Sequence, residues 1–278
     1  LYGINADSIY GYENGRFFPI LSRKNRLIRN VVSWQEIYFS DRASNSKLFL
    51  FDGKNIHQFH QPFNMVLDVM KDDEGNLWVG TESGLWRLQS YGFQNYLSER
   101  NNNFYTWSVA QDKDGNYLFG SFLHGLMTYD GVSFRKVPID HMFKDNGYQF
   151  FYSGKYVDRY GNVFLGTSRG IIKQYGSDYS WFYLHDPNDA ILYIYYDNDE
   201  DQLLCTSSRH GLIEVDFDGN VFEHNDRTRR DYTGLETSVL KDKFGRIWLS
   251  GKMGICIKED GKWKKLPDDN DSIPIGAI

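Results

Sequence analysis

Two short stretches of the chain combine side chains suited to ligand binding. The stretch "SFLHG" contains Phe122 and His124, and the stretch "TSSRHG" contains Arg209 and His210. Aromatic rings can pack against the flat C–H face of a sugar, while planar polar groups form paired hydrogen bonds with hydroxyls. This mixture is suited to the recognition of an oligosaccharide. The alternative is that each aromatic ring packs beneath its own loop.

The candidate ligand-binding residues all come from connections between strand-like runs, and we expect these connections to meet on one face of the protein. They combine aromatic rings with imidazole and guanidinium groups. The candidates are Phe122, His124, Arg169, Arg209, His210, Tyr105, Trp107, Tyr148, Arg229 and Tyr232.

Basic residues cluster in two of these connections, although the chain has a net charge of −6. Arg227, Arg229 and Arg230 share one connection, and a second contains the stretch "RKNR" at 23–26. A basic rim on an acidic chain would favour a sulfated or uronic-acid polysaccharide. Ordinary solvated loop charge is the alternative. The acidic balance argues against a nucleic-acid partner.

We predict no catalytic residue, metal site or cofactor. The turns "DDEGN" and "DKDGN" resemble the start of a calcium loop but lack its further ligands and its Glu at position twelve, so we interpret each Asp as stabilising a tight turn. Carboxylate pairs for glycoside cleavage cannot be recognised from spacing alone. A polysaccharide lyase or glycoside hydrolase therefore stays as an alternative. Cys205 and Cys256 are interpreted as small buried residues, with a disulfide as the alternative.

The elements that would position these residues form an internal repeat. The stretch "DDEGNLWVGTESGLWRL" at 72–88 recurs along the chain, and its first glycine aligns with a small residue in every copy. Seven copies follow one another at spacings of 37 to 46 residues. The aligned positions are Gly3, Ser40, Gly80, Gly120, Gly166, Cys205 and Ser250.

Each copy contains four short runs typical of β-strands, separated by Gly- and Asp-rich turns. Four-stranded units at this period predict an all-β fold, a seven-bladed β-propeller. We expect a single domain over 1–278. Its first blade combines 1–22 with 270–278, so that the C-terminal strand closes the ring. The other blades are predicted at 28–61, 62–97, 104–138, 148–184, 189–224 and 234–267.

Both glycines of the repeat are interpreted as structural. The first, as in Gly80, leaves room for a side chain of the neighbouring blade. The second, as in Gly84, ends the turn between the second and third strands, where a positive φ is expected.

The pattern D-x-x-G-N-L-W-x-G-T-x-x-G-L resembles the two-component regulator propeller repeat. It is carried best at 72–85 and again at 112–126, 158–171 and 242–255, whereas the copy around Cys205 lacks the turn glycine and the Trp. The resemblance implies a periplasmic or extracellular sensor domain, membrane-anchored in a longer protein. It also implies an oligosaccharide ligand and a histidine kinase region that receives the signal.

Two further expectations concern the chain as a whole. It begins with Leu1 and contains no apolar stretch long enough to span a membrane, so we expect a processed or excised chain. It is either a fragment of a longer sensor or a free-standing relative. A homodimer is also expected. A propeller that serves protein interaction or dimerisation, without a glycan ligand, is the remaining alternative.

Overall fold

The computed structural model describes most of the chain from residue 37 onward and the strands that precede it. The described residues are 2–4, 8–13, 16–22, 28–32, 37–41, 47–52, 54–63, 65–89, 92–96, 105–121, 124–143, 151–183, 186, 188–223, 238–251 and 254–265. Over these ranges the regular structure is β-strand, apart from one short 3-10 helix at Asp140–Phe143.

The described strands form antiparallel sheets, each built from strands that are consecutive in the sequence. We name the sheets A to G in chain order. Sheet A has three strands and each of the others has four. The strands are β1 (Tyr2–Ile4), β2 (Ser8–Glu13) and β3 (Arg16–Ser22) in A; β4 (Ile28–Val32), β5 (Ile37–Asp41), β6 (Leu48–Phe51) and β7 (Ile56–Gln58) in B; β8 (Val66–Lys71), β9 (Leu77–Thr81), β10 (Gly84–Gln89) and β11 (Gly92–Asn95) in C; β12 (Thr106–Gln111), β13 (Tyr117–Ser121), β14 (Leu126–Tyr129) and β15 (Phe134–Lys136) in D; β16 (Phe151–Val157), β17 (Val163–Thr167), β18 (Gly170–Tyr175) and β19 (Asp178–Tyr183) in E; β20 (Ile191–Asp197), β21 (Gln202–Ser207), β22 (Gly211–Asp216) and β23 (Val221–Glu223) in F; and β24 (Ser238–Lys241), β25 (Ile247–Gly251), β26 (Gly254–Glu259) and β27 (Lys262–Lys265) in G.

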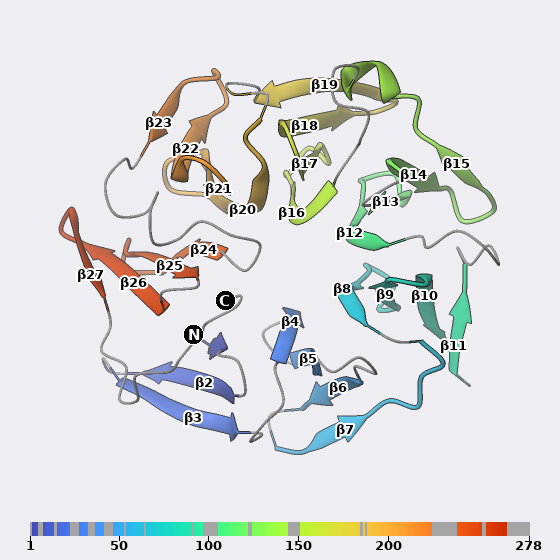
Figure 1. Cartoon of the computed structure of the whole chain (residues 1–278), viewed down its shortest axis with the longest axis horizontal. Coiled ribbons are helices and arrows are strands. Elements are labelled where there is room, and N and C mark those ends of the chain that lie inside the picture. The colour runs from blue at the N-terminus through green and yellow to red at the C-terminus, as the bar shows by residue number, and fades with distance from the viewer. Residues whose placement is uncertain are drawn as a thin grey trace.

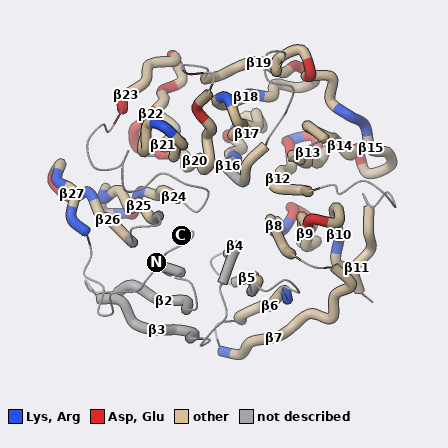
Figure 2. The backbone as a smooth tube through the Cα atoms, in the orientation of Figure 1, with Lys and Arg blue, Asp and Glu red and all other residues tan. Residues whose placement is uncertain are grey.

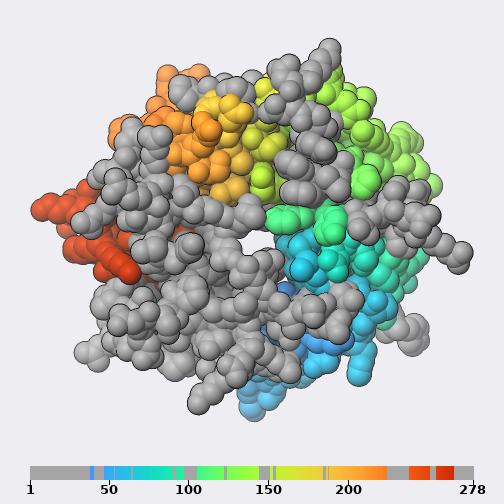
Figure 3. All heavy atoms as spheres, in the orientation of Figure 1, coloured from blue at the N-terminus to red at the C-terminus, as the bar shows by residue number. Residues whose placement is uncertain are grey.

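The sheets are arranged around a central axis, as the ribbon (Figure 1) and the backbone tube (Figure 2) show. The heavy atoms of sheets C to G follow the same order around it (Figure 3). In sheets B to G the first strand lies nearest the axis, and the fourth lies at the periphery. The prediction of an all-β fold is therefore confirmed. The predicted strand at 270–278 lies outside the described residues.

The second strand of a sheet is covered on both faces, which explains its continuous apolar sequence. Every residue of β9, β13 and β17 is buried. The core lies between neighbouring sheets: Trp78 of sheet C packs with Val109 and Phe119 of sheet D. A strand between two packed faces has no solvated side, so the polar alternation of a one-sided sheet disappears.

The first glycine of the repeat lies where two sheets approach closely. A Cβ atom added to Gly120 would lie 2.4 Å from Cβ of Phe151 in the next sheet, and one added to Gly80 would lie 2.6 Å from the carbonyl oxygen of Thr106. The second glycine has the positive φ expected of its turn, with a φ of 123° at Gly84. Both interpretations of the glycines are confirmed at these positions.

The Asp that opens the repeat links one sheet to the next. Asp72 accepts hydrogen bonds from Nε1 of Trp78, at 2.8 Å, and from the hydroxyl of Tyr117 in sheet D, at 2.8 Å. It also accepts from the backbone N–H of Asn76 in its own turn, at 2.6 Å. Burial raises the pKa of Asp72, but these hydrogen bonds outweigh burial and the net pKa lies below its ordinary value.

Similar contacts recur between other sheets. Oδ2 of Asp112 in sheet D accepts a hydrogen bond from Nε2 of Gln174 in sheet E, at 3.2 Å. Asp197 in sheet F forms an ion pair with Nζ of Lys241 in sheet G, at 2.8 Å. The Asp residues of the repeat turns therefore accept donors from the protein itself, which agrees with a structural role.

Three further observations bear on the sequence predictions. Cys205 and Cys256 are buried thiols that are not joined by a disulfide, so the disulfide alternative is wrong. Within the described ranges, no group of three or more His, Cys, Asp or Glu side chains is arranged to hold a metal ion. Nor does that part of the chain contain a helix long and apolar enough to cross a membrane.

Candidate ligand-binding face

The turns between the second and third strands of the sheets are held by a hydroxyl group. Oγ1 of Thr81 donates to the carbonyl oxygen of Gly84, at 2.9 Å, and Oγ1 of Thr167 donates to that of Gly170, at 3.0 Å. In sheet D, Oγ of Ser121 accepts from the backbone N–H of His124, at 3.2 Å. Each turn therefore has a fixed backbone, which sets the direction in which its side chains leave the sheet.

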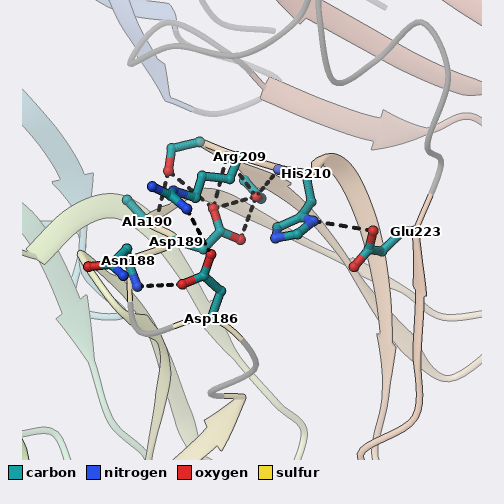
Figure 4. A network of polar contacts seen from close by, with 9 residues as sticks. Asp186, Asn188, Asp189, Ala190, Arg209, His210 and Glu223 are labelled. Carbon is teal, nitrogen blue, oxygen red and sulfur yellow. Dashed lines mark hydrogen bonds and ion pairs between the residues drawn. The ribbon is translucent and has the colours of Figure 1, made fainter.

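In sheet F a buried carboxylate reinforces this turn. Asp189 has an exposed fraction of 0%. It accepts hydrogen bonds from Oγ of Ser207 at 2.6 Å, from Oγ of Ser208 at 3.1 Å and from the backbone N–H of Arg209 at 2.9 Å. Figure 4 shows these contacts converging on Asp189 from the turn. Three donors to one buried carboxylate make Asp189 a positioning residue, because its charge serves to fix the turn.

The fixed turn presents Arg209 to solvent. The Arg209 side chain is 56% exposed, and its Nη1 atom lies 3.2 Å from Oδ2 of Asp186. The backbone N–H of Asn188 donates to the other oxygen of Asp186, at 2.8 Å. This hydrogen bond, together with the charge of Arg209, lowers the pKa of Asp186 (Figure 4). A guanidinium group held by one exposed contact keeps further N–H donors available for a ligand.

His210 lies on the other side of the same turn. Its Nδ1 atom is 3.2 Å from Oε2 of Glu223, and its side chain is 16% exposed. The neighbouring Tyr183 is buried, and burial together with the charges of Asp189 and Glu223 raises the pKa of its hydroxyl. Tyr183 therefore stays protonated at neutral pH and can act as a hydrogen-bond donor.

Aromatic residues lie on the inner strands of sheets D and E. The ring of Trp107 in β12 meets the ring of Tyr152 in β16 edge to face, with centroids 6.3 Å apart. Both residues are partly exposed, and burial raises the pKa of Tyr152. Tyr105, which directly precedes β12, is also partly exposed.

A charged pair near the axis was not among the predicted site residues. Oδ2 of Asp68 in β8 accepts from the backbone N–H of Val109 in β12, at 2.9 Å, and pairs with Nζ of Lys155 in β16. Burial and the Asp68 charge raise the pKa of Tyr193 in β20. The signal was present in "VLDVM" and "SGKYV", where one charge interrupts an inner strand.

The structure therefore brings together only part of the predicted set. Arg209 and His210 share the turn fixed by Asp189, whereas Trp107 lies on an inner strand of another sheet. Arg169 is buried, with an exposed fraction of 8%, and its backbone N–H donates to Oγ1 of Thr167. The predicted residues outside the described ranges are Phe122, Tyr148, Arg229 and Tyr232, as are Arg227, Arg230 and the basic stretch at 23–26.

Asp186 and Asp189, which the sequence analysis did not single out, are the residues that shape this face. They lie in "DPND", a turn-forming stretch between two strands. Its composition predicts a turn, but it does not reveal that the second Asp reaches the hydroxyl groups of a turn some 18 residues later.

Comparison with family models matches the two-component regulator propeller at residues 60–83. This match confirms the resemblance drawn from the repeat. Comparison by sequence with curated proteins finds no match.

Solved structures with a similar fold bind different ligands. A catalytically inactive virginiamycin B lyase from Staphylococcus aureus, bound to quinupristin, is 12% identical, with a TM-score of 0.71 over 90% of this chain and 87% of that chain. YCF48 bound to a D1 peptide is 11% identical, with a TM-score of 0.62 over 97% of this chain and 88% of that chain. These likenesses support a propeller-like fold, and fold alone does not determine function.

The extracellular domain of a predicted hybrid two component system from B. thetaiotaomicron is 15% identical. The alignment covers 96% of this chain and 50% of that chain, with a TM-score of 0.42. A TM-score this low supports no inference about fold or function.

Proposed function

We propose that this chain, whose repeat matches the two-component regulator propeller, is the sensory domain of a two-component signalling regulator. The match at 60–83 is the observation that carries the proposal. In this proposal the domain is a closed ring of seven blades over 1–278, with 1–22 and 270–278 in the first blade. It is periplasmic or extracellular, without catalysis of its own.

The proposed ligand is an oligosaccharide bound at the face that carries Arg209 and His210. Support comes from the exposed guanidinium of Arg209 and from the rigid turn beneath it, which Asp189 holds through three hydrogen bonds. A turn whose backbone is already fixed loses little conformational freedom when it binds a ligand. A guanidinium group favours carboxylate or sulfate groups, so acidic oligosaccharides are the preferred class.

Signalling would follow from a shift in population. A ligand that binds one arrangement of a sensor dimer more tightly than the other favours that arrangement, and a histidine kinase region of the same polypeptide would read the change. The homodimer and the kinase are parts of the proposal.

Isothermal titration calorimetry against a panel of neutral and acidic oligosaccharides tests the proposal, with analysis of the same mixtures for cleavage products. We expect binding without cleavage. For an acidic ligand we expect an affinity that falls with added salt and falls about tenfold in Arg209→Ala. Arg135→Ala, another exposed arginine paired with an Asp, is the matched control.

Two alternatives are separated by the same experiment. The likeness to a lyase of S. aureus favours a propeller enzyme as the second candidate, and cleavage products would support it. The absence of binding to every oligosaccharide in the panel would contradict a glycan sensor and favour a protein-interaction propeller.

A further inference from the structure

A groove of about 1180 Å³ lies between sheets B and C, and none of its described lining residues belongs to sheet F, which carries Arg209. One wall is the segment from Gln58 to Pro62, which leaves β7 and leads toward β8, and the other wall comes from β10 and β11. Figure 1 shows β7 and β11 at the periphery of the molecule, with the connection after β7 passing beside β10 and β11. The outermost strands of both sheets therefore line the groove, through Gln58 of β7 and through Gly92 to Gln94 of β11.

Aromatic rings form the floor of the groove. The rings of Phe59 and Phe93 line it and meet edge to face, with centroids 5.9 Å apart. Beneath them the buried ring of Phe63 contacts Phe93, with centroids 4.8 Å apart. Phe59 and Phe93 are themselves only partly buried. Their remaining surface is apolar and is held in place from below, which suits the C–H face of a pyranose ring.

Amide side chains surround this floor. Gln58, Gln89 and Gln94 line the groove and are exposed. Nε2 of Gln89 donates to Oε1 of Gln94 at 2.6 Å, which orients both amides. An amide carries a donor and an acceptor in one plane, so it can pair with two adjacent sugar hydroxyls.

The groove has basic lining residues, but these make other interactions within the protein. They therefore give only a weak preference for an acidic ligand. Of its described lining residues, Lys47, Lys71 and Arg87 are basic and none is acidic. The guanidinium carbon of Arg87 lies 5.3 Å from the centre of the Trp78 ring. Trp78 packs toward sheet D, which is on the side of sheet C away from the groove. Both lysines make other interactions within the protein. The recognition groups that remain are rings and amides, which are neutral.

We propose that this groove is a second binding site, which takes a neutral oligosaccharide of several pyranose units. Its volume exceeds the roughly 300–1,000 Å³ of ordinary small-molecule pockets, and its open shape suits an extended chain. The proposal rests on the proposed function in one respect, that the protein recognises oligosaccharides. It differs in the location of the site and in the class of glycan.

The test uses β-1,4-linked hexasaccharides of glucose, xylose and mannose as probes, with calorimetry for affinity and hydrogen exchange for location. We expect one of them to bind independently of salt and to protect the backbone amides of 58–63 and 92–96. Phe93→Ala should weaken binding about tenfold, as expected for the loss of a stacking contact worth about 1.5 kcal/mol. Tyr175→Ala, which removes an exposed ring from sheet E, should leave the affinity unchanged.

Gln58→Ala is the second variant, because its exposed amide can be removed without disturbing the contacts of Phe93. It should weaken binding severalfold while the melting temperature stays the same. The groove site would be wrong if a bound oligosaccharide protected 189–210 and not the groove, or if only acidic oligosaccharides bound. The proposed function would still stand in either case. Failure of every neutral and acidic oligosaccharide to bind would overturn both.

Discussion

The link from Asp72 to the next sheet provides the sharpest test of how this fold is held together. In Asp72→Ala the carboxylate that accepts from Trp78 in its own sheet and from Tyr117 in sheet D is lost. The hydrogen bonds to the Asn76 backbone and side chain are lost as well. The substitution therefore removes the hydrogen bonds of the turn, one hydrogen bond within sheet C and one between sheets C and D at the same time.

The loss in free energy of unfolding depends on whether each donor keeps another acceptor. Trp78 is 0% exposed, so its Nε1–H loses its acceptor in a place that water does not reach, at about 1–3 kcal/mol. Tyr117 loses less, because its hydroxyl keeps a second acceptor, Oε2 of Glu74, at 3.2 Å. The turn contacts of Asn76 add about 1 kcal/mol. We expect the free energy of unfolding to fall by about 3–5 kcal/mol and the melting temperature by about 10 °C.

Differential scanning calorimetry and urea titration measure the change, and Asp73→Ala is the matched control. Asp73 lies in the same turn but is exposed, so its replacement should change stability by less than about 0.5 kcal/mol. Tyr117→Phe alone should cost about 1–2 kcal/mol. In the Asp72→Ala background it should cost less, because both substitutions remove the same hydrogen bond, the one between Tyr117 and Asp72. Equal stability of Asp72→Ala and Asp73→Ala would refute the reasoning.

Three further outcomes are expected. Gly120→Ala should destabilise the fold by about 1–3 kcal/mol in urea titration, since its new Cβ would meet Phe151 at 2.4 Å; an unchanged unfolding midpoint would contradict the close approach. Because the pKa of Asp72 is lowered on folding, its stabilisation is present above the ordinary Asp pKa and is lost as the pH falls below it through the folded-state pKa. Asp72→Ala should therefore show a shallower loss of stability in acid, and parallel curves of stability against pH would refute this. Asp189→Ala should lower the free energy of unfolding by about 2–4 kcal/mol in the melting experiment, whereas Arg209→Ala should lower it by less than about 0.5 kcal/mol. Similar losses in the two variants would show that Asp189 does not position the turn.

The fold was readable from the sequence because the repeat combines several independent signals. The apolar run "LWVGT" predicted a strand covered on both faces, and β9 is buried at every residue. The small residue at Gly120 predicted a close approach, and the side chain of Phe151 occupies the space a Cβ would need. These signals are local, since each depends on a few residues of one copy and on the packing that every copy repeats.

The site was less predictable because its contacts join residues that are distant in the sequence. Arg209 and His210 were identified from the length and composition of one turn. Nothing in that turn indicated that Asp189, at the end of the preceding connection, would accept three hydrogen bonds from it. The pairing of Asp68 with Lys155 is more distant still, because it depends on where the inner strands of sheets C and E stand around the axis.

The contacts that join one sheet to the next also give the repeats a fixed order. Each uses the same acidic residue type on one side and a different partner on the other: a phenol, an amide or an ammonium group. The pairs are Asp72 with Tyr117, Asp112 with Gln174 and Asp197 with Lys241. The sheets are therefore not interchangeable, although sheets B to G have the same arrangement of strands. Exchanging sheets D and E within the sequence, for example, would separate Asp72 from Tyr117.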